Sequence, residues 1–217
     1  QEWRAWHPRL DEYERTRAER FVDRRDQERY VIAHTALRSI LARYLSIQPH
    51  AVRFTWADGI KPTLAAEMGS DLRFNLSHSH KLAVCAVGRN REVGVDLEYV
   101  YHDFPYEMVA ASLFSPIEQL ILASLPPAQR VAGFFHGWTR KEAFVKALGA
   151  GLSLPLNSFD VSLAPGSKPE LLDIRADINP RTDWSLRDLD LNGAYTGALA
   201  AAGQGWHSRG MSWSWQS

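Results

Sequence analysis

The sequence predicts an α+β protein in which each half combines a long helix with a small antiparallel sheet. Three observations support this fold class: helical periodicity over residues 11–47, strand-like alternation over residues 72–98, and a second long helical stretch that is followed by further strand-like segments. A chain of 217 residues can bury a substantial core as one or two lobes. Each half has a helix followed by a small antiparallel sheet, and the two halves divide near Val100. We therefore expect an N-terminal lobe at 1–99 and a C-terminal lobe at 100–217.

The first half begins with helices over residues 11–47, where apolar side chains recur at spacings of three and four. Asp23 or Asp26 can cap the second of these helices, and Pro49 ends the pattern. The strands expected in this half span residues 52–56, 73–77, 82–87 and 92–98, with an antiparallel hairpin among the last three.

The second half carries a clear helix start at Ser115, where the hydroxyl can cap, Pro116 takes the first helical position and Glu118 closes a capping box. A long helix through residues 134–148 should stop at Gly149, since glycine suits a left-handed C-terminal position. The strands expected here span residues 159–163, 184–189 and 195–201.

Two short patterns place charged side chains together. Asp96 and Glu98 share one face of a strand because strand side chains alternate, and Glu142 and Lys146 lie one helical turn apart. Three carboxylates beside a lysine indicate Mg²⁺-assisted chemistry on a phosphate ester. The alternative is a solvated strand face, with Glu142 paired to Lys141 or Lys146.

Four ordered segments resemble the signature segments of 4′-phosphopantetheinyl transferases of the larger, two-lobed, surfactin-synthetase-activating type. They are FNLSHS at 74–79, GVDLE at 94–98, WTRKEAFVKALGAGLSLPL at 138–156 and, more weakly, GIKP at 59–62. Ile60 stands where the family usually has glycine. The resemblance covers nearly the whole chain except its ends. It implies that the two lobes are related by a pseudo-twofold axis, with the active site in the cleft between them.

The resemblance also implies roles for individual residues. Glu142 and Lys146 would be catalytic, Glu142 as the base for a serine proton, directly or through a water, and Lys146 as a stabiliser of the leaving phosphate. Asp96, Glu98 and Glu142 would bind Mg²⁺, for which Mn²⁺ can substitute. The coenzyme A contacts implied by the resemblance are Arg25, Lys61, Asn75, Ser77, His78 and Lys146, with Arg25, Lys61 and His78 at phosphate.

The function implied is transfer of the 4′-phosphopantetheine arm of coenzyme A to a serine of an apo acyl, peptidyl or aryl carrier protein, which releases adenosine 3′,5′-bisphosphate. One alternative is a non-catalytic coenzyme A- or carrier-binding module of the same fold, and another is a Mg²⁺-dependent phosphate-ester hydrolase. A serine hydrolase built on Ser77 and His78 is excluded, because adjacent strand residues point to opposite faces and no G-x-S-x-G motif surrounds Ser77.

The aromatic segment 99–114 admits two interpretations, ordinary core or a docking surface for the carrier helix, with Phe104 and Tyr106 as anchors in the second. The tail 205–217 contains three tryptophans and receives no functional assignment.

Composition sets broad limits. The 25 basic and 25 acidic residues give a formal net charge of zero, which argues against wholesale binding of nucleic acid or membrane. No apolar run approaches the ~20 residues needed to span a bilayer. Cys85 is the single cysteine, so an internal disulfide is impossible and a reducing compartment is expected. We therefore expect a cytoplasmic monomer.

Overall fold

The computed structural model describes residues 2–57, 61–149, 151, 154–175, 183–191 and 194–214. Two compact units make up the chain: the first contains residues 1–56, 62–71 and 205–217, and the second contains residues 57–61 and 72–204. The lobe boundary at residues 99 and 100, which the sequence predicts, stays a prediction. The pseudo-twofold relation between lobes stays a prediction.

The first unit is mainly helical. It contains α1 (Glu12–Glu19), α2 (Arg24–Leu45) and the short antiparallel pair β1 (Phe54–Thr55) and β2 (Thr63–Leu64). Asp23 caps α2 as expected, since its carboxylate accepts a hydrogen bond from the Arg25 amide. The strand expected at residues 52–56 is shorter, because residues 49–51 form a 3₁₀ turn.

A buried ionic network joins the helices of this unit. Arg38 is 1% exposed and bonds both Glu14 and Asp11 at 2.6 Å, and a third bond runs to the carbonyl oxygen of Val52 at 2.9 Å. Buried charges of this kind are tolerated only when they are paired and hydrogen-bonded. The network therefore fixes α1 and the residues before β1 against α2.

The second unit contains the strands that concern the site. Strands β3 (Leu72–Ser79) and β4 (Leu82–Arg89) form the antiparallel hairpin that the sequence predicts. Strand β5 (Val93–Tyr99) pairs with β9 (Tyr195–Ala202), which in turn pairs with β8 (Trp184–Asp188), all antiparallel. A further antiparallel pair consists of β6 (Phe159–Val161) and β7 (Leu171–Ile174), and the sequence does not predict β7.

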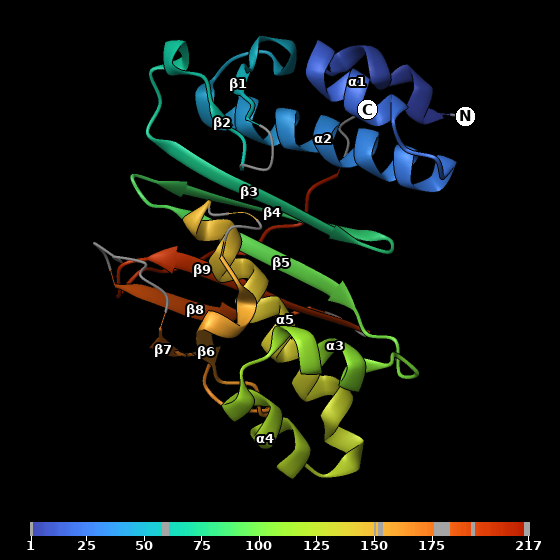
Figure 1. Ribbon diagram of the computed structural model, residues 1–217. Helices are drawn as coiled ribbons and strands as arrows, with labels where there is room; N and C mark the ends of the chain where they lie inside the picture. Colours follow the sequence, from blue (N-terminus) through green and yellow to red (C-terminus); the bar gives the residue numbers. More distant parts are fainter. Residues whose placement is uncertain are drawn as a thin grey trace. The chain divides into compact units, whose positions relative to one another are not determined.

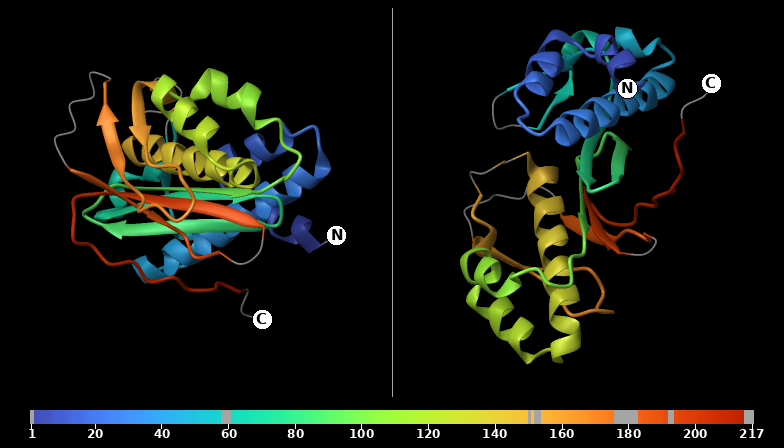
Figure 2. Two further views of the ribbon diagram at one scale, coloured as in Figure 1. Left: turned by 90° about the horizontal axis from the view of Figure 1, so that it is seen from below. Right: turned by 90° about the vertical axis from the view of Figure 1, so that its right-hand side faces the viewer.

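Helix α5 (Pro127–Leu148) packs against β5 and β9, as Figure 1 and the right-hand view of Figure 2 show. It ends at Gly149, whose φ of 68° is the left-handed conformation that the sequence predicts. Helices α3 (Tyr106–Leu113) and α4 (Pro116–Ser124) pack around its N-terminal half, and α4 begins with the expected Ser115 capping box. The fold class predicted from sequence, α+β with small antiparallel sheets, is confirmed.

Two apolar clusters hold the second unit together. The C-terminal half of α5 packs on β6, β8 and β9 through residues such as Phe144 and Phe159. The N-terminal half packs on α3 and α4, where Phe104 lies 5.5 Å from the ring of Phe134 and Tyr106 lies against the same cluster. Phe104 and Tyr106 are thus partly buried side chains that pack against the core, which favours the first of the two interpretations of the aromatic segment.

Within the described residues, no helix combines the length and the apolar character required to cross a membrane.

Candidate active site

The glycine of the GVDLE segment sets the distance between β5 and α5. Gly94 faces the helix so closely that an added Cβ would lie 2.1 Å from the carbonyl oxygen of Ala143 and 2.2 Å from the amide nitrogen of Ala147. Because strand side chains alternate, Asp96 and Glu98 lie on the same face of β5 as Gly94. The close approach at Gly94 therefore brings the side of α5 that carries Lys146 to the first carboxylate.

Asp96 is the centre of the site. It is 3% exposed, and its Oδ1 accepts hydrogen bonds from Lys146 Nζ at 2.6 Å and from Ser77 Oγ at 3.1 Å. The Lys146 ammonium also reaches Ser77 Oγ at 3.2 Å, so the three polar groups form a closed triangle. Within the described part of the chain, the buried Oδ2 of Asp96 has no hydrogen-bond partner. An unsatisfied buried carboxylate oxygen costs free energy unless a cation or donor meets it.

Strand β3 is attached to β5 through hydrogen bonds of its side chains. The described backbone pairing places these two strands in separate sheets. Asn75 accepts from the amide of Val95 at 2.8 Å, and Ser77 donates to Asp96. Ser79 donates to Oε2 of Glu98 at 2.8 Å and accepts from the amide of Tyr99 at 3.0 Å.

These three side chains, Asn75, Ser77 and Ser79, occur at every second residue and so lie on one face of β3. The alternation of polar residues in FNLSHS thus has a structural reason, because these side chains join β3 to β5, two strands without backbone pairing in the described part of the chain.

The carboxylates of Glu98 and Glu142 lie in surroundings that favour their protonated forms. Burial raises the pKa of each, and the nearby charge of Asp96 raises it further, whereas Lys146 has the opposite effect. The pKa of Glu98 is also raised slightly by Glu142, which shows that the three predicted ligands lie within electrostatic reach of one another. Such a cluster of partly buried negative charges would be stabilised by a bound cation.

Whether these residues fit Mg²⁺ can be judged from the donor set and its geometry. As the side chains stand, the described residues contain no group of three His, Cys, Asp or Glu side chains able to hold a metal ion by themselves. Mg²⁺ commonly binds through one or two carboxylates together with substrate phosphate oxygens, so a complete protein cage is not required. The unsatisfied Oδ2 of Asp96 and the all-oxygen donor set fit Mg²⁺.

The three residues predicted to contact phosphate groups of coenzyme A, Lys61, His78 and Arg25, are not part of the Asp96 triangle. Lys61 is held by Glu92 at 3.1 Å and by the carbonyl oxygen of Val93 at 2.7 Å, and burial lowers its pKa. His78 is exposed and follows Ser77 on β3, so its side chain lies on the opposite face from the Asp96 triangle. Arg25 is exposed in the first unit. The coenzyme roles of these three residues stay predictions, and Gly59 and Ile60 of the GIKP segment lie outside the described residues.

Lys141 does not pair with Glu142. Its ammonium is fully buried, lies 2.8 Å from Glu118 and also donates to the carbonyl oxygens of Leu156 and Phe159. Of the lysines that the sequence offers as partners of Glu142, Lys141 thus has a structural role and Lys146 faces Asp96. Ser79 was absent from the predicted site, although the alternating pattern at residues 75–79 signals its position.

Comparison with known proteins identifies the same family along most of the chain. Two family models match, one described as 4′-phosphopantetheinyl transferase superfamily at residues 92–200 and one as the N-terminal part of 4′-phosphopantetheinyl transferase at residues 1–90. The chain belongs to the 4′-phosphopantetheinyl transferase superfamily. The superfamily match contains Asp96, Glu98, Glu142 and Lys146, and the N-terminal match contains Asn75, Ser77 and Ser79.

Several curated 4′-phosphopantetheinyl transferases are similar to this member of the superfamily. HetI of Nostoc sp. is 37% identical over 92% of this chain and 81% of the relative. Sfp of Bacillus subtilis is 31% identical over 69% of this chain, and the match spans 64% of Sfp, which is less than two thirds of its length. Among solved structures, an apo-ACPS from Chronobacterium ammoniagenes is 19% identical with a TM-score of 0.42, covering 52% of this chain and 95% of that chain.

Proposed function

We propose that this superfamily member transfers the 4′-phosphopantetheine arm of coenzyme A to a serine of an apo acyl, peptidyl or aryl carrier protein. The observation that carries the proposal is the triangle of Lys146, Asp96 and Ser77, with Glu98 and Glu142 within electrostatic reach. In a member of this superfamily, an ammonium beside a buried carboxylate cluster suits a substrate that brings its own phosphates. The arrangement supports enzymatic transfer over a non-catalytic binding module, because all four charged residues are present.

Asp96, Glu98 and Glu142 would hold Mg²⁺, with Mn²⁺ as a substitute. When bound, the ion would supply positive charge to the pyrophosphate of coenzyme A. Lys146 is already held by Asp96 and its side chain is 30% exposed, so the side chain is both oriented and partly accessible to solvent. We assign to it the stabilisation of negative charge that grows on the leaving phosphate.

The reaction requires one bond to form and one to break. The carrier serine oxygen attacks the β-phosphorus of coenzyme A, and the bond from that phosphorus to the oxygen bridging the two phosphates breaks. The serine proton passes to Glu142, directly or through a water, and adenosine 3′,5′-bisphosphate leaves with the bridging oxygen. The carrier retains the phosphopantetheine as a phosphodiester.

Intact-mass spectrometry tests the proposal. Purified apo acyl, peptidyl and aryl carriers would each be incubated with the protein, coenzyme A and Mg²⁺. At least one carrier should gain a single phosphopantetheine, and a carrier whose acceptor serine is replaced by alanine should gain nothing. EDTA should abolish transfer, and Mn²⁺ should partly restore it.

Incubation without any carrier separates the proposal from phosphate-ester hydrolysis. A transferase leaves coenzyme A intact when no acceptor is present, whereas a hydrolase releases the adenosine bisphosphate. Release of that product in the absence of carrier, or a panel in which no carrier gains mass, would refute the proposed function.

A further inference from the structure

Ser79 forms two hydrogen bonds at the edge of the carboxylate cluster and takes part in none of the roles proposed above. Its hydroxyl donates to Oε2 of Glu98 at 2.8 Å and accepts from the backbone amide of Tyr99 at 3.0 Å. Both partners belong to β5, the strand that also carries Asp96. The serine therefore connects β3 to the end of β5 at the second predicted metal ligand.

The direction of the serine proton follows from the second bond. A serine hydroxyl has one proton to donate and lone pairs that accept. The amide of Tyr99 can only donate, so it occupies a lone pair of Ser79 Oγ. The proton is then directed to Oε2 of Glu98, which accepts it. Ser79 is thus a fixed donor to one oxygen of Glu98.

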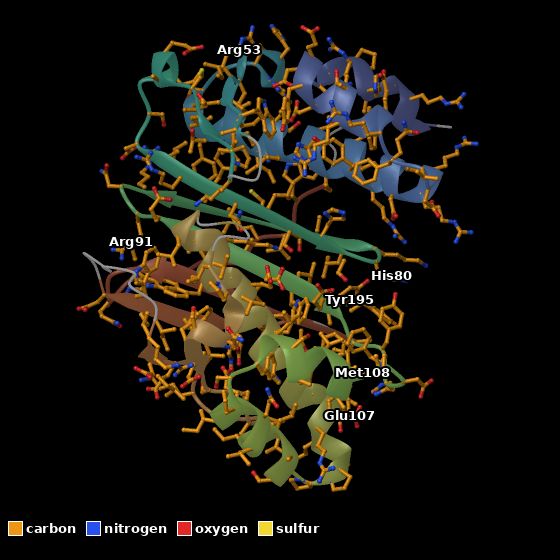
Figure 3. The ribbon with its side chains drawn as sticks, in the orientation of Figure 1. Arg53, His80, Arg91, Glu107, Met108 and Tyr195 are labelled. Atoms are coloured by element: carbon orange, nitrogen blue, oxygen red, sulfur yellow. The ribbon has the colours of Figure 1, made fainter. Side chains whose placement is uncertain are left out.

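The turn that follows Ser79 is itself held in place. The ring of His80 lies 4.7 Å from that of Tyr99, and the amide of Lys81 donates to the hydroxyl of Tyr195 at 3.3 Å. Figure 3 shows His80 and Tyr195 near each other at this end of the strands. With contacts to both β5 and β9, the end of β3 cannot move without breaking ring and hydrogen-bond contacts, so the position of the Ser79 hydroxyl is set by the fold.

The same arrangement occurs at Asp96. Ser77 donates to Oδ1 of Asp96, two residues before Ser79 on β3, and the buried Oδ2 has no partner within the described residues. In each case a serine of β3 donates a hydrogen bond to one oxygen of a β5 carboxylate. Carboxylates that bind metals are usually oriented by such outer hydrogen bonds, and loss of one typically weakens metal affinity or activity by about 10–100-fold.

We infer that Ser79 is a positioning residue, which holds the carboxylate of Glu98 in the orientation that binds the divalent cation. The inference rests on the proposed function, because it assigns Glu98 to the metal. Ser79 itself contacts neither substrate nor metal.

A matched pair of variants isolates the hydroxyl. Ser79→Thr keeps it, and Ser79→Val has nearly the same shape without it, while both β-branched residues suit a strand. Ser185→Ala serves as a control, because Ser185 lies on β8 and donates to the carbonyl oxygen of Gly203 at 2.7 Å, away from the carboxylates. Melting temperatures of all variants would be measured first, so that loss of fold is recognised.

The main readout is the affinity for Mn²⁺ alone, measured by electron paramagnetic resonance without coenzyme A or carrier. Ser79→Val should weaken Mn²⁺ binding by roughly 10-fold or more, whereas Ser79→Thr and Ser185→Ala should stay within about threefold of wild type. In the transfer assay, Ser79→Val should raise the Mg²⁺ concentration needed for half-maximal rate, and saturating Mg²⁺ should recover most of kcat. The Michaelis constant for the carrier should not change.

The outcomes test the positioning role of Ser79 separately from the proposed transferase function. Equal Mn²⁺ affinity in the Val and Thr variants overturns the inference, and so does a fall in kcat that saturating Mg²⁺ does not recover. If wild type transfers the arm normally while Ser79→Val is unaffected, only the inference fails. If wild-type protein neither binds Mn²⁺ nor transfers the arm, the proposed function fails and the inference fails with it.

Discussion

Gly94→Ala should damage both stability and activity through a single methyl group. The added Cβ would lie 2.1 Å from the carbonyl oxygen of Ala143, whereas an ordinary contact begins at 3.4 Å, so β5 and α5 would have to separate by about 1.3 Å. Overpacking of this kind costs about 1–3 kcal/mol. In a chain of this size that lowers Tm by roughly 2–12 °C, and we expect the upper part of that range because backbone atoms cannot rotate away.

The same separation would act on the site. Lys146 lies on α5 and Asp96 on β5, and their contact is 2.6 Å. Lengthening it to about 4 Å takes it beyond hydrogen-bond range. Misplacement by about 1 Å can cost on the order of 10²-fold in rate, and we expect a loss of kcat of that size.

Calorimetric unfolding and the carrier-transfer assay measure the two effects on the same preparation. Gly210→Ala is the control, since nothing lies within 4 Å of a Cβ at that position and its Tm and kcat should match wild type. A Gly94→Ala variant with wild-type Tm and wild-type kcat would refute the reasoning. A stable variant that has lost activity would show that the helix moves at little cost.

Three further substitutions test other parts of the structure. Asp96→Asn keeps the shape but removes the charge between Lys146 and the proposed cation, so the transfer rate should fall by on the order of 10²-fold with Tm little changed. Lys141→Met leaves the buried carboxylate of Glu118 without its cation and should cost about 3–5 kcal/mol in chemical denaturation, part of which the double variant Lys141→Met/Glu118→Gln should recover. Hydrogen bonds from Arg175 hold the pKa of Asp160 below its usual value, so this pair stabilises the fold above the unfolded pKa of about 3.9 and ceases to do so as pH falls through the lowered pKa. The stability difference between wild type and Asp160→Asn, measured by urea unfolding, should therefore shrink between pH 6 and pH 3.

Local signals made several elements predictable. The Ser115 capping box and the glycine that ends α5 depend on residues within one turn of each other, and both occur as expected. Helix α3 escaped prediction because its N-cap is Pro105, which supplies no capping side chain, and because eight residues give little periodicity. Strand β7 is short and carries little alternation.

The site shows the same division between local and tertiary information. Spacing alone places Glu142 and Lys146 on one face of a helix, but it cannot tell that Lys141 is buried against Glu118. The positioning role of Ser79 also cannot be derived from spacing, because its partner Glu98 lies on a strand with no described backbone pairing to β3. Sequence patterns thus identify candidate groups, and the contacts between strands decide which of them work together.

The pairing of β5 with β9 has a consequence for how the protein is made. These strands are separated by roughly 100 residues of sequence, so β9 leaves the ribosome about 5–20 s after β5 at ordinary rates of synthesis. During that interval the strand bearing Asp96 and Glu98 has an open edge, which is prone to pair with other chains. A nascent or truncated chain without residues 195–202 would carry every acidic group of the site and still lack the neighbour that holds them in register. We expect such chains to depend on chaperones and to aggregate.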